Sequence, residues 1–279
     1  MKGPLAHEMK KSLRNPLFYL SLLLGLAIAL WHAYEAVTYA LWADSVDHFY
    51  VSNQSCFANW IVVDCNARVS STVFFYVTPF LAALPFSWSL LSERMSGYDG
   101  QLAIREKRCD WIGAKAVAAF LSGALVVMVP LLVNLVAIAC FLPAYVPQVE
   151  ESMTVGVLGD CLFSELFYRC PMAYVAAFVS LDGALCGFWS VFVLSLSAFF
   201  RNRISLLFIP YLALLAWQYV TKAAFYSSGL VGFSLNMIDD MKGVYYSQAP
   251  NPLVIALSLL ATSLISALLL RLYGKREVL

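Results

Sequence analysis

Apolar residues gather in six long stretches of the chain, separated by shorter segments rich in charged and polar residues. A transmembrane helix needs about 20 mostly apolar residues to cross a hydrocarbon core roughly 30 Å thick, and each stretch is long enough. The pattern predicts an all-α integral membrane protein with six transmembrane helices in a single transmembrane domain, 1–279. The predicted spans cover approximately residues 16–41, 70–92, 113–142, 172–200, 204–222 and 252–271.

The segment before the first span has a different period. Leu5, Met9 and Leu13 recur at every fourth position, which is typical of one apolar helix face. The other positions predict a basic face suited to the inner leaflet of a membrane, so lipid is an expected partner. The sequence therefore predicts an amphipathic interfacial helix over residues 4–15, and the alternative is a frayed basic tail held by anionic lipid. The basic face comprises His7, Lys10, Lys11 and Arg14.

Asp182 complicates the fourth span. In a helix running from Pro171 to Phe200 its carboxylate lies near mid-membrane, at a cost of about 2.5 to 3.5 kcal/mol. A crossing restricted to Gly183–Phe200 places Asp182 at the outer interface instead, and we prefer this placement. In the longer helix Asp182 becomes a candidate pathway residue. Asn134 is a second candidate, although intramembrane amides such as Asn134 and Gln218 more often bond neighbouring helices.

Composition and charge agree with a membrane protein. The chain is 61% hydrophobic and carries a net charge of only +1, which excludes a soluble globular domain and offers nothing for a nucleic-acid partner. The distribution of Lys and Arg is uneven: fourteen fall on the side that holds both termini in a six-span topology, and four fall on the other side. By the positive-inside rule, both termini are expected in the cytoplasm and the protein in the plasma membrane.

Four of the seven cysteines fall in the outer loops of this topology. Disulfides form in oxidising compartments outside the cytoplasm. Four cysteines allow three connectivities, and proximity in sequence favours one pair within each loop. Free buried thiols are the alternative, whereas the spacing is too wide for a zinc site. The disulfide candidates are Cys56 with Cys65 and Cys161 with Cys170.

The sequence lacks the motifs of several enzyme classes. It contains no G-x-x-x-x-G-K-[ST] run to cradle nucleotide phosphates, and no H-E-x-x-H zinc motif. None of the three histidines falls at mid-membrane, so a buried Ser-His site has no base. His32 and Glu35 lie one helical turn apart, where they could bind a cation or titrate near neutral pH, but contact with interface water is the more common reading. We expect no enzymatic activity, and no cofactor or metal in this chain.

The densest charge lies between the second and third spans, in "SERMSGYDGQLAIREKRCDWIGAK", residues Ser92–Lys115. Met95, Tyr98 and Leu102 follow helical spacing with charges of both signs around them. Gly97 and Gly100 each cost about 1 kcal/mol of helix stability relative to alanine, so a short, imperfect helix is expected. Mixed charge favours a protein-binding surface, and the alternative is a solvated turn that only orients the chain.

This segment and the architecture around it resemble the permease subunits of type-2 ATP-binding-cassette (ABC) exporters. The resemblance rests on the amphipathic leader, six spans, small outer loops and a charged segment that starts "ER" before a glycine. It implies that residues 93–111 form a cytoplasmic coupling helix, with Glu93 and Arg94 at its start and Lys115 closing it. The implied ATPase-coupling residues are Glu93, Arg94, Gly97, Tyr98, Leu102 and Arg105.

The same resemblance implies the partners. ATP and Mg would be bound by a separate ABC ATPase subunit, and a second permease copy or homologue would complete the transport path. The aromatic content of the chain, separately, suits an amphiphilic cargo. A rival reading is a polytopic sensor or immunity protein without transport, whose charged segment recruits a different partner.

Overall fold

The computed structural model describes residues 4–46, 54–66, 68–97, 108–228, 236–244 and 251–275. These residues form helices and no strands, which confirms the all-α prediction for the described part of the chain. Five described helices are long and apolar enough to cross a membrane, as expected of a multi-pass membrane protein. They are α2 (Pro16–Val46), α6 (Arg108–Ala139), α9 (Pro171–Ser195), α10 (Arg203–Ser228) and α12 (Pro252–Lys275).

The starts of these helices follow from local sequence. Pro16 and Pro252 open α2 and α12, at a position where the missing proline N–H would have no helical partner. The preceding asparagines act as caps: Asn15 Oδ1 accepts a 3.1 Å hydrogen bond from the Leu17 N–H, and Asn251 Oδ1 accepts one of 3.0 Å from the Leu253 N–H. The Asn-Pro pairs therefore set where both helices begin.

The second predicted span differs from expectation, because residues 70–92 do not form one continuous helix. The segment consists of α3 (Val69–Ala83), turns over residues 84–88, and α4 (Ser89–Met95). Pro85 has no N–H to donate and disfavours helix at the residue before it. Residues of this turn form hydrogen bonds with other parts of the chain: Asn15 Nδ2 donates to the Pro85 carbonyl at 2.6 Å, and Ser87 Oγ donates to the Ser190 carbonyl at 2.9 Å.

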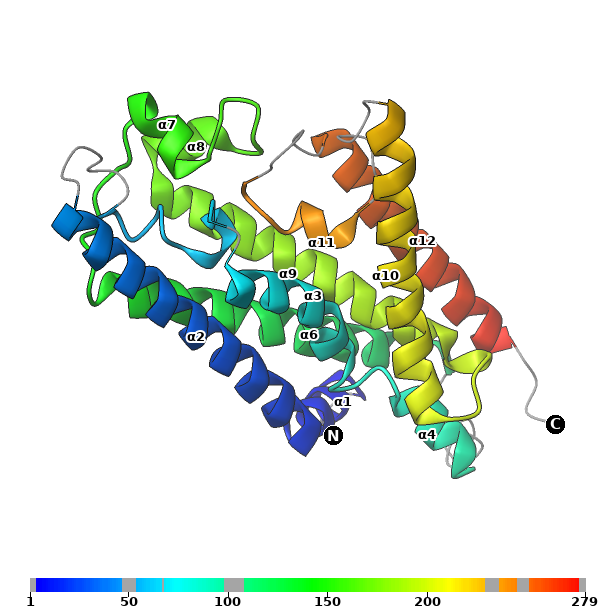
Figure 1. The fold of residues 1–279 in the computed structure, drawn as a ribbon. Helices are drawn as coiled ribbons and strands as arrows, with labels where there is room; N and C mark the ends of the chain where they lie inside the picture. Colours follow the sequence, from blue (N-terminus) through cyan, green and yellow to red (C-terminus); the bar gives the residue numbers. More distant parts are fainter. Residues whose placement is uncertain are drawn as a thin grey trace.

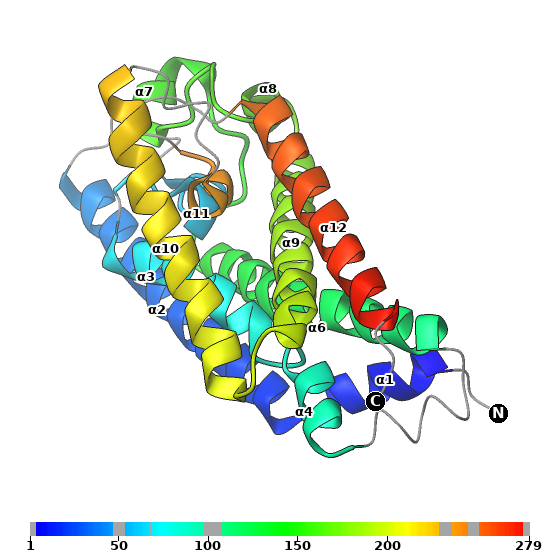
Figure 2. The same ribbon diagram turned by 90° about the vertical axis from the view of Figure 1, so that its right-hand side faces the viewer.

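The centre of the molecule is the α6–α9 pair, with α2 and α3 against it (Figure 1). Close approach depends on glycines. A Cβ at Gly123 of α6 would lie 2.8 Å from the Ser190 Cβ, and one at Gly187 of α9 would lie 2.7 Å from the Phe120 ring. Small residues at a helix interface let two backbones pack closely in a membrane protein. α10 and α12 lie at the periphery, on either side of α9 (Figure 2).

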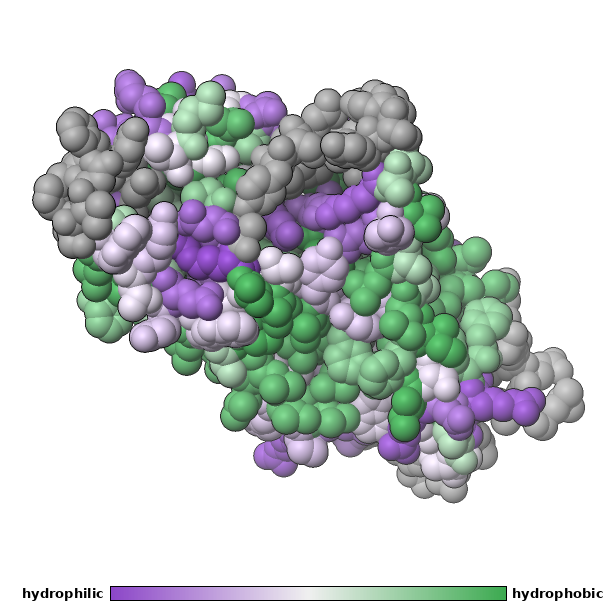
Figure 3. Space-filling model, in the orientation of Figure 1, coloured by the Kyte–Doolittle hydropathy of each residue, from purple (hydrophilic) through white to green (hydrophobic). Residues whose placement is uncertain are grey.

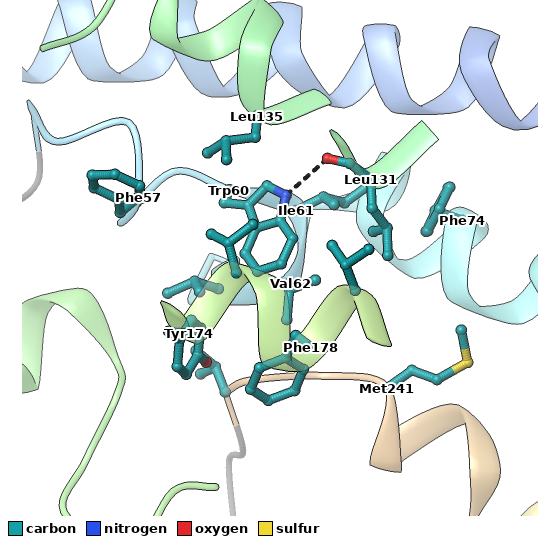
Figure 4. Packing of buried hydrophobic residues seen from close by; sticks show 14 of the residues in the cluster. Phe57, Trp60, Ile61, Val62, Phe74, Leu131, Leu135, Tyr174, Phe178 and Met241 are labelled. Carbon is teal, nitrogen blue, oxygen red and sulfur yellow. Dashed lines mark hydrogen bonds between the residues drawn. The ribbon is translucent and has the colours of Figure 1, made fainter. Parts of the chain in front are cut away.

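The loop after α2 contributes to the core instead of lying on the surface. Trp60 and the 3₁₀ turn η2 (Ile61–Val63) are buried. The Trp60 Nε1–H donates a 3.0 Å hydrogen bond to the Leu131 carbonyl of α6, and the indole meets the Tyr174 ring edge-on (Figure 4). The other connections contain short helices, as expected for loops without a domain of their own: η3 (Val149–Glu151), α7 (Ser152–Val155), α8 (Ser164–Arg169) and α11 (Met237–Asp240).

Hydrophobic side chains gather on the outer surface of the bundle, over α3 and α10, with hydrophilic ones towards its two ends (Figure 3). Exposed apolar side chains are numerous on α12 as well, including Leu257 and Leu264. Large exposed apolar surfaces require a lipid or protein covering. Below, the end of the bundle that holds α1 (Pro4–Leu13) and α4 is called the basic end, and the end that holds α7 and α8 the loop end.

Candidate functional site

A buried ion cluster joins three helices at the basic end. Lys115 of α6 is fully buried, and its Nζ donates hydrogen bonds of 2.8 Å to Glu8 Oε2 of α1 and 2.7 Å to Glu93 Oε1 of α4. Lys11 of α1 also pairs with Glu93 Oε1. Two cations and two carboxylates thus balance in charge, which a buried arrangement requires. The ammonium of Lys115 also lies 5.2 Å from the Trp111 ring centroid, within reach of a cation–π contact.

The placement of α1 is partly as predicted. A helix does form at Pro4–Leu13, and Lys10 and Lys11 are exposed on it. Of the predicted apolar face, Met9 and Leu13 pack against the core and Leu5 is exposed, while the polar residues Glu8 and Ser12 are buried as well where α1 packs on α6. The apolar period alone missed Glu8. Glu8 is the only acid in residues 4–15, but no local spacing points to its partner Lys115, which lies 107 positions away in the sequence.

The described candidate coupling residues lie beside this cluster. Glu93 is buried within it, whereas Arg94 reaches the turn after α9: its guanidinium donates to the Ala198 carbonyl at 3.1 Å and to the Phe200 carbonyl at 2.5 Å. Gly97 is exposed with a φ of 70°, a left-handed conformation that favours glycine. Tyr98, Leu102 and Arg105 lie outside the described residues. α4 is consequently bonded to α1, α6 and the connection between α9 and α10.

Asn134 joins three elements towards the loop end. Its Nδ2 donates to the Ala29 carbonyl of α2 at 2.7 Å and lies 3.2 Å from His32 Nδ1, and its Oδ1 accepts a 3.1 Å bond from the Ile61 N–H. All of these partners are buried within the bundle. These contacts match the structural reading of Asn134 and not an open path.

His32 does not pair with Glu35, although the two lie one turn apart. His32 Nε2 lies 3.9 Å from Asp64 Oδ2, and Glu35 accepts a hydrogen bond from Ser70. Asp64 in turn accepts bonds from Arg68 and Ser71. Among the described residues, no three His, Cys, Asp or Glu side chains gather closely enough to hold a metal ion.

Asp182 lies in the interior of α9, because the helix begins at Pro171. The helix thus follows the longer of the two alternatives, with Gly183 inside it and not at its start. Asp182 is fully buried, and neither carboxyl oxygen has a hydrogen-bond partner among the described residues. The early helix start follows from Pro171, which suits a first helical turn. A buried ionisable residue inside a span is a functional candidate by default.

No disulfide joins any of the four described candidate cysteines, so the expected within-loop pairs do not form. The buried turn η2 separates Cys56 from Cys65, and α8 separates Cys161 from Cys170. Each loop packs on the other instead: the Cys56 N–H donates to the Pro143 carbonyl at 3.0 Å, and Cys65 Sγ lies 3.5 Å from the Thr154 carbonyl. Burial raises the pKa of the Cys56 thiol to about 11.

No protein-family model matches this chain, and no curated protein or solved structure matches it either.

Proposed function

We propose that this chain is the transmembrane subunit of an ATP-driven ABC exporter of the type-2 kind, a permease that couples to separate ATPase subunits and has no enzymatic site of its own. In this proposal the basic end, both termini and residues 93–111 face the cytoplasm, and the chain lies in the plasma membrane. ATP and Mg belong to the partner ATPase, and a second permease copy or homologue completes the path.

The observation that carries the proposal is the attachment of α4. Residues 98–107 follow α4 directly and include the densest charge of the chain. Glu93 and Arg94, just before them, are bonded to α1, to α6 and to the connection leading into α10. A force applied to the charged segment would be transmitted to several long helices at once, as a rigid-body movement requires.

Burial makes these attachments firm. An exposed ion pair contributes only about 0 to 1 kcal/mol, whereas breaking a buried pair costs about 3 to 5 kcal/mol because it leaves an uncompensated charge. Lys115 and Glu93 belong to the second kind. A solvated turn that served only to orient the chain would need no such anchoring, which favours a mechanical role.

The test is co-purification of partners in mild detergent, followed by mass spectrometry. Arg105→Glu changes the charged segment itself, and Arg201→Glu is the matched control, because Arg201 is an exposed arginine at the same end of the bundle. We expect a P-loop ATPase with the wild type and with Arg201→Glu, and its loss with Arg105→Glu at an unchanged melting temperature. Recovery of a kinase, or of no ATPase in any detergent, would favour the sensor or immunity reading.

A further inference from the structure

A large apolar cavity opens on the side of the bundle, between α9, α10 and α12. Its volume is about 1010 Å³, and its walls are formed by residues such as Trp189, Phe192, Trp217, Leu257 and Ile265. The volume is at the upper end of the ligand-pocket range of roughly 300 to 1,000 Å³. The cavity exists because α12 packs along α9 while α10 contacts mainly α3, which leaves the two peripheral helices apart (Figure 2).

Two side chains that line this cavity, Trp189 and Gln218, have buried polar atoms with no hydrogen-bond partner among the described residues. Gln218 of α10 is only 4% exposed, and among the described residues neither its Nε2 nor its Oε1 has a hydrogen-bond partner. The expected bond between Gln218 and a neighbouring helix is therefore not formed. Leaving a buried polar group unsatisfied costs about 1 to 3 kcal/mol. Asn134, the other intramembrane amide considered, is by contrast bonded on both of its polar atoms.

Polar and apolar side chains line different parts of the cavity. Gln218 and Asn236 lie towards the loop end, whereas Leu196, Phe200 and Ile209 line the part nearer the basic end. Gln218 and Ile209 are nine positions apart on α10, which corresponds to roughly 14 Å at 1.5 Å per residue. No Lys, Arg, Asp or Glu is among the lining residues described. The site thus offers neutral polar groups, of which Gln218 presents both a donor and an acceptor without partners among the described residues, beside a long apolar wall.

We infer that this cavity binds a neutral amphiphile, with its hydroxyl or carbonyl group against Gln218 and its alkyl chain along α9 and α12. An amide presents both donors and an acceptor, so it complements a hydroxyl fully. A charged headgroup finds no countercharge there, and burial of an unpaired charge is expensive. An apolar helix of a second copy would cover the walls but leave Gln218 unsatisfied, so the small ligand is the better occupant.

That the bound amphiphile is a transported cargo rests on the proposed function. That the cavity binds an amphiphile does not depend on it. Binding is therefore measured without any ATPase, on the purified full chain in phosphatidylcholine nanodiscs. The probe is hexadecanol carrying a diazirine in its chain, and the sites of photo-labelling are mapped by mass spectrometry. A failed partner pull-down combined with positive labelling would overturn only the exporter proposal, and the reverse pattern only this inference.

We expect labelling on the cavity faces of α9, α10 and α12. Unlabelled hexadecanol should suppress it about five- to tenfold more effectively than hexadecane, the ratio expected for one hydrogen bond of about 1 kcal/mol. Palmitate should compete weakly at pH 9, where its headgroup is charged. Gln218→Leu should abolish the preference for the alcohol over the hydrocarbon while the protein remains folded, because Gln218 makes no side-chain bond that the substitution could break.

A second pair of variants tests the location. Ala213→Trp puts an indole into the cavity, and Leu212→Trp puts one on a neighbouring position of α10 that is 57% exposed and does not line it. Ala213→Trp should remove the labelling, whereas Leu212→Trp should keep it. Labelling spread over the exposed face of α12 that excess hexadecanol does not suppress would overturn the inference, as would an unchanged alcohol preference in Gln218→Leu.

Discussion

Lys115 of α6 and Glu93 of α4 lie 2.7 Å apart, Nζ to Oε1, in the interior of the basic end. The two residues are separated by the charged connection in sequence, and their pairing closes that connection into a loop with a fixed base. The pair also receives Glu8 and Lys11 from α1. The N-terminal helix is thereby part of the bundle and not only an accessory on its surface.

Replacing Lys115 by methionine should destabilise the protein by about 3 to 5 kcal/mol, because two carboxylates lose their buried cation. Lys11→Met is the control, since Lys11 is 44% exposed and its pair with Glu93 should contribute at most about 1 kcal/mol. Unfolding of the purified protein in one detergent measures both. Adding Glu8→Gln and Glu93→Gln to Lys115→Met should recover part of the loss; no recovery would mean that packing of the Lys115 stem dominates.

Replacing Asp182 by leucine should raise the free energy of unfolding by about 1 to 3 kcal/mol, because the carboxyl group is buried with no hydrogen-bond partner among the described residues. Leucine has a similar size and no polar atom. Ser180→Ala, at an exposed position of the same helix, should change little. A less stable Asp182→Leu protein would show instead that the carboxyl binds an ion or water, and would strengthen Asp182 as a candidate pathway residue.

Asn134→Leu should lower the free energy of unfolding by about 2 to 4 kcal/mol. The substitution leaves the buried Ile61 N–H without its acceptor and removes the donor to the Ala29 carbonyl, and each unsatisfied group costs about 1 to 3 kcal/mol. Gln218→Leu is the matched comparison and should raise the free energy of unfolding by about 1 to 3 kcal/mol, because neither polar atom of Gln218 has a partner among the described residues. If both variants lost the same free energy of unfolding in a denaturation experiment, the two amides would not differ in their hydrogen bonding as the structure indicates.

Stability should fall as pH rises towards 8, because of Asp240. Burial, and secondly Asp239, raises the pKa of the Asp240 carboxyl to about 8 in the folded protein, against about 3.9 in an unfolded chain. Between these values the folded state holds more protons than the unfolded state, so the free energy of unfolding decreases with pH and levels off above 8. Asp240→Asn should remove this decrease. Melting temperatures of the wild type and of Asp240→Asn, measured from pH 5 to 9, test this prediction. Asp160→Asn, at an exposed position, is the control and should leave the wild-type slope of stability against pH unchanged.

Thiol labelling should separate the cysteines by burial. Cys140 and Cys170 are exposed and should react quickly with iodoacetamide in the native protein. Cys56 should react slowly, because it is buried and its raised pKa leaves little thiolate. Peptide mapping before and after reduction gives the result. Labelling of any of the four loop cysteines only after reduction would restore the disulfide prediction for that residue.

The sequence alone determined the helical class and the approximate position of most long helices, because an apolar run of sufficient length has few alternatives to a membrane helix. It also determined where α2 and α12 begin, since Asn-Pro pairs act locally. The break at Pro85 was readable in principle, but apolar content over residues 70–92 masked it.

Partnership between distant residues was decided only by the tertiary structure. Glu93 was predicted as a contact for another protein, yet burial beside Lys115 gives it internal partners, which no spacing along the chain could reveal. The side-chain amide of Asn134 is hydrogen-bonded, whereas that of Gln218 has no partner among the described residues. The difference arises because helix packing decides which groups come within hydrogen-bond distance of a buried amide. Hydrophobic pattern sets which segments form helices, whereas helix packing sets which polar groups find a hydrogen-bond partner.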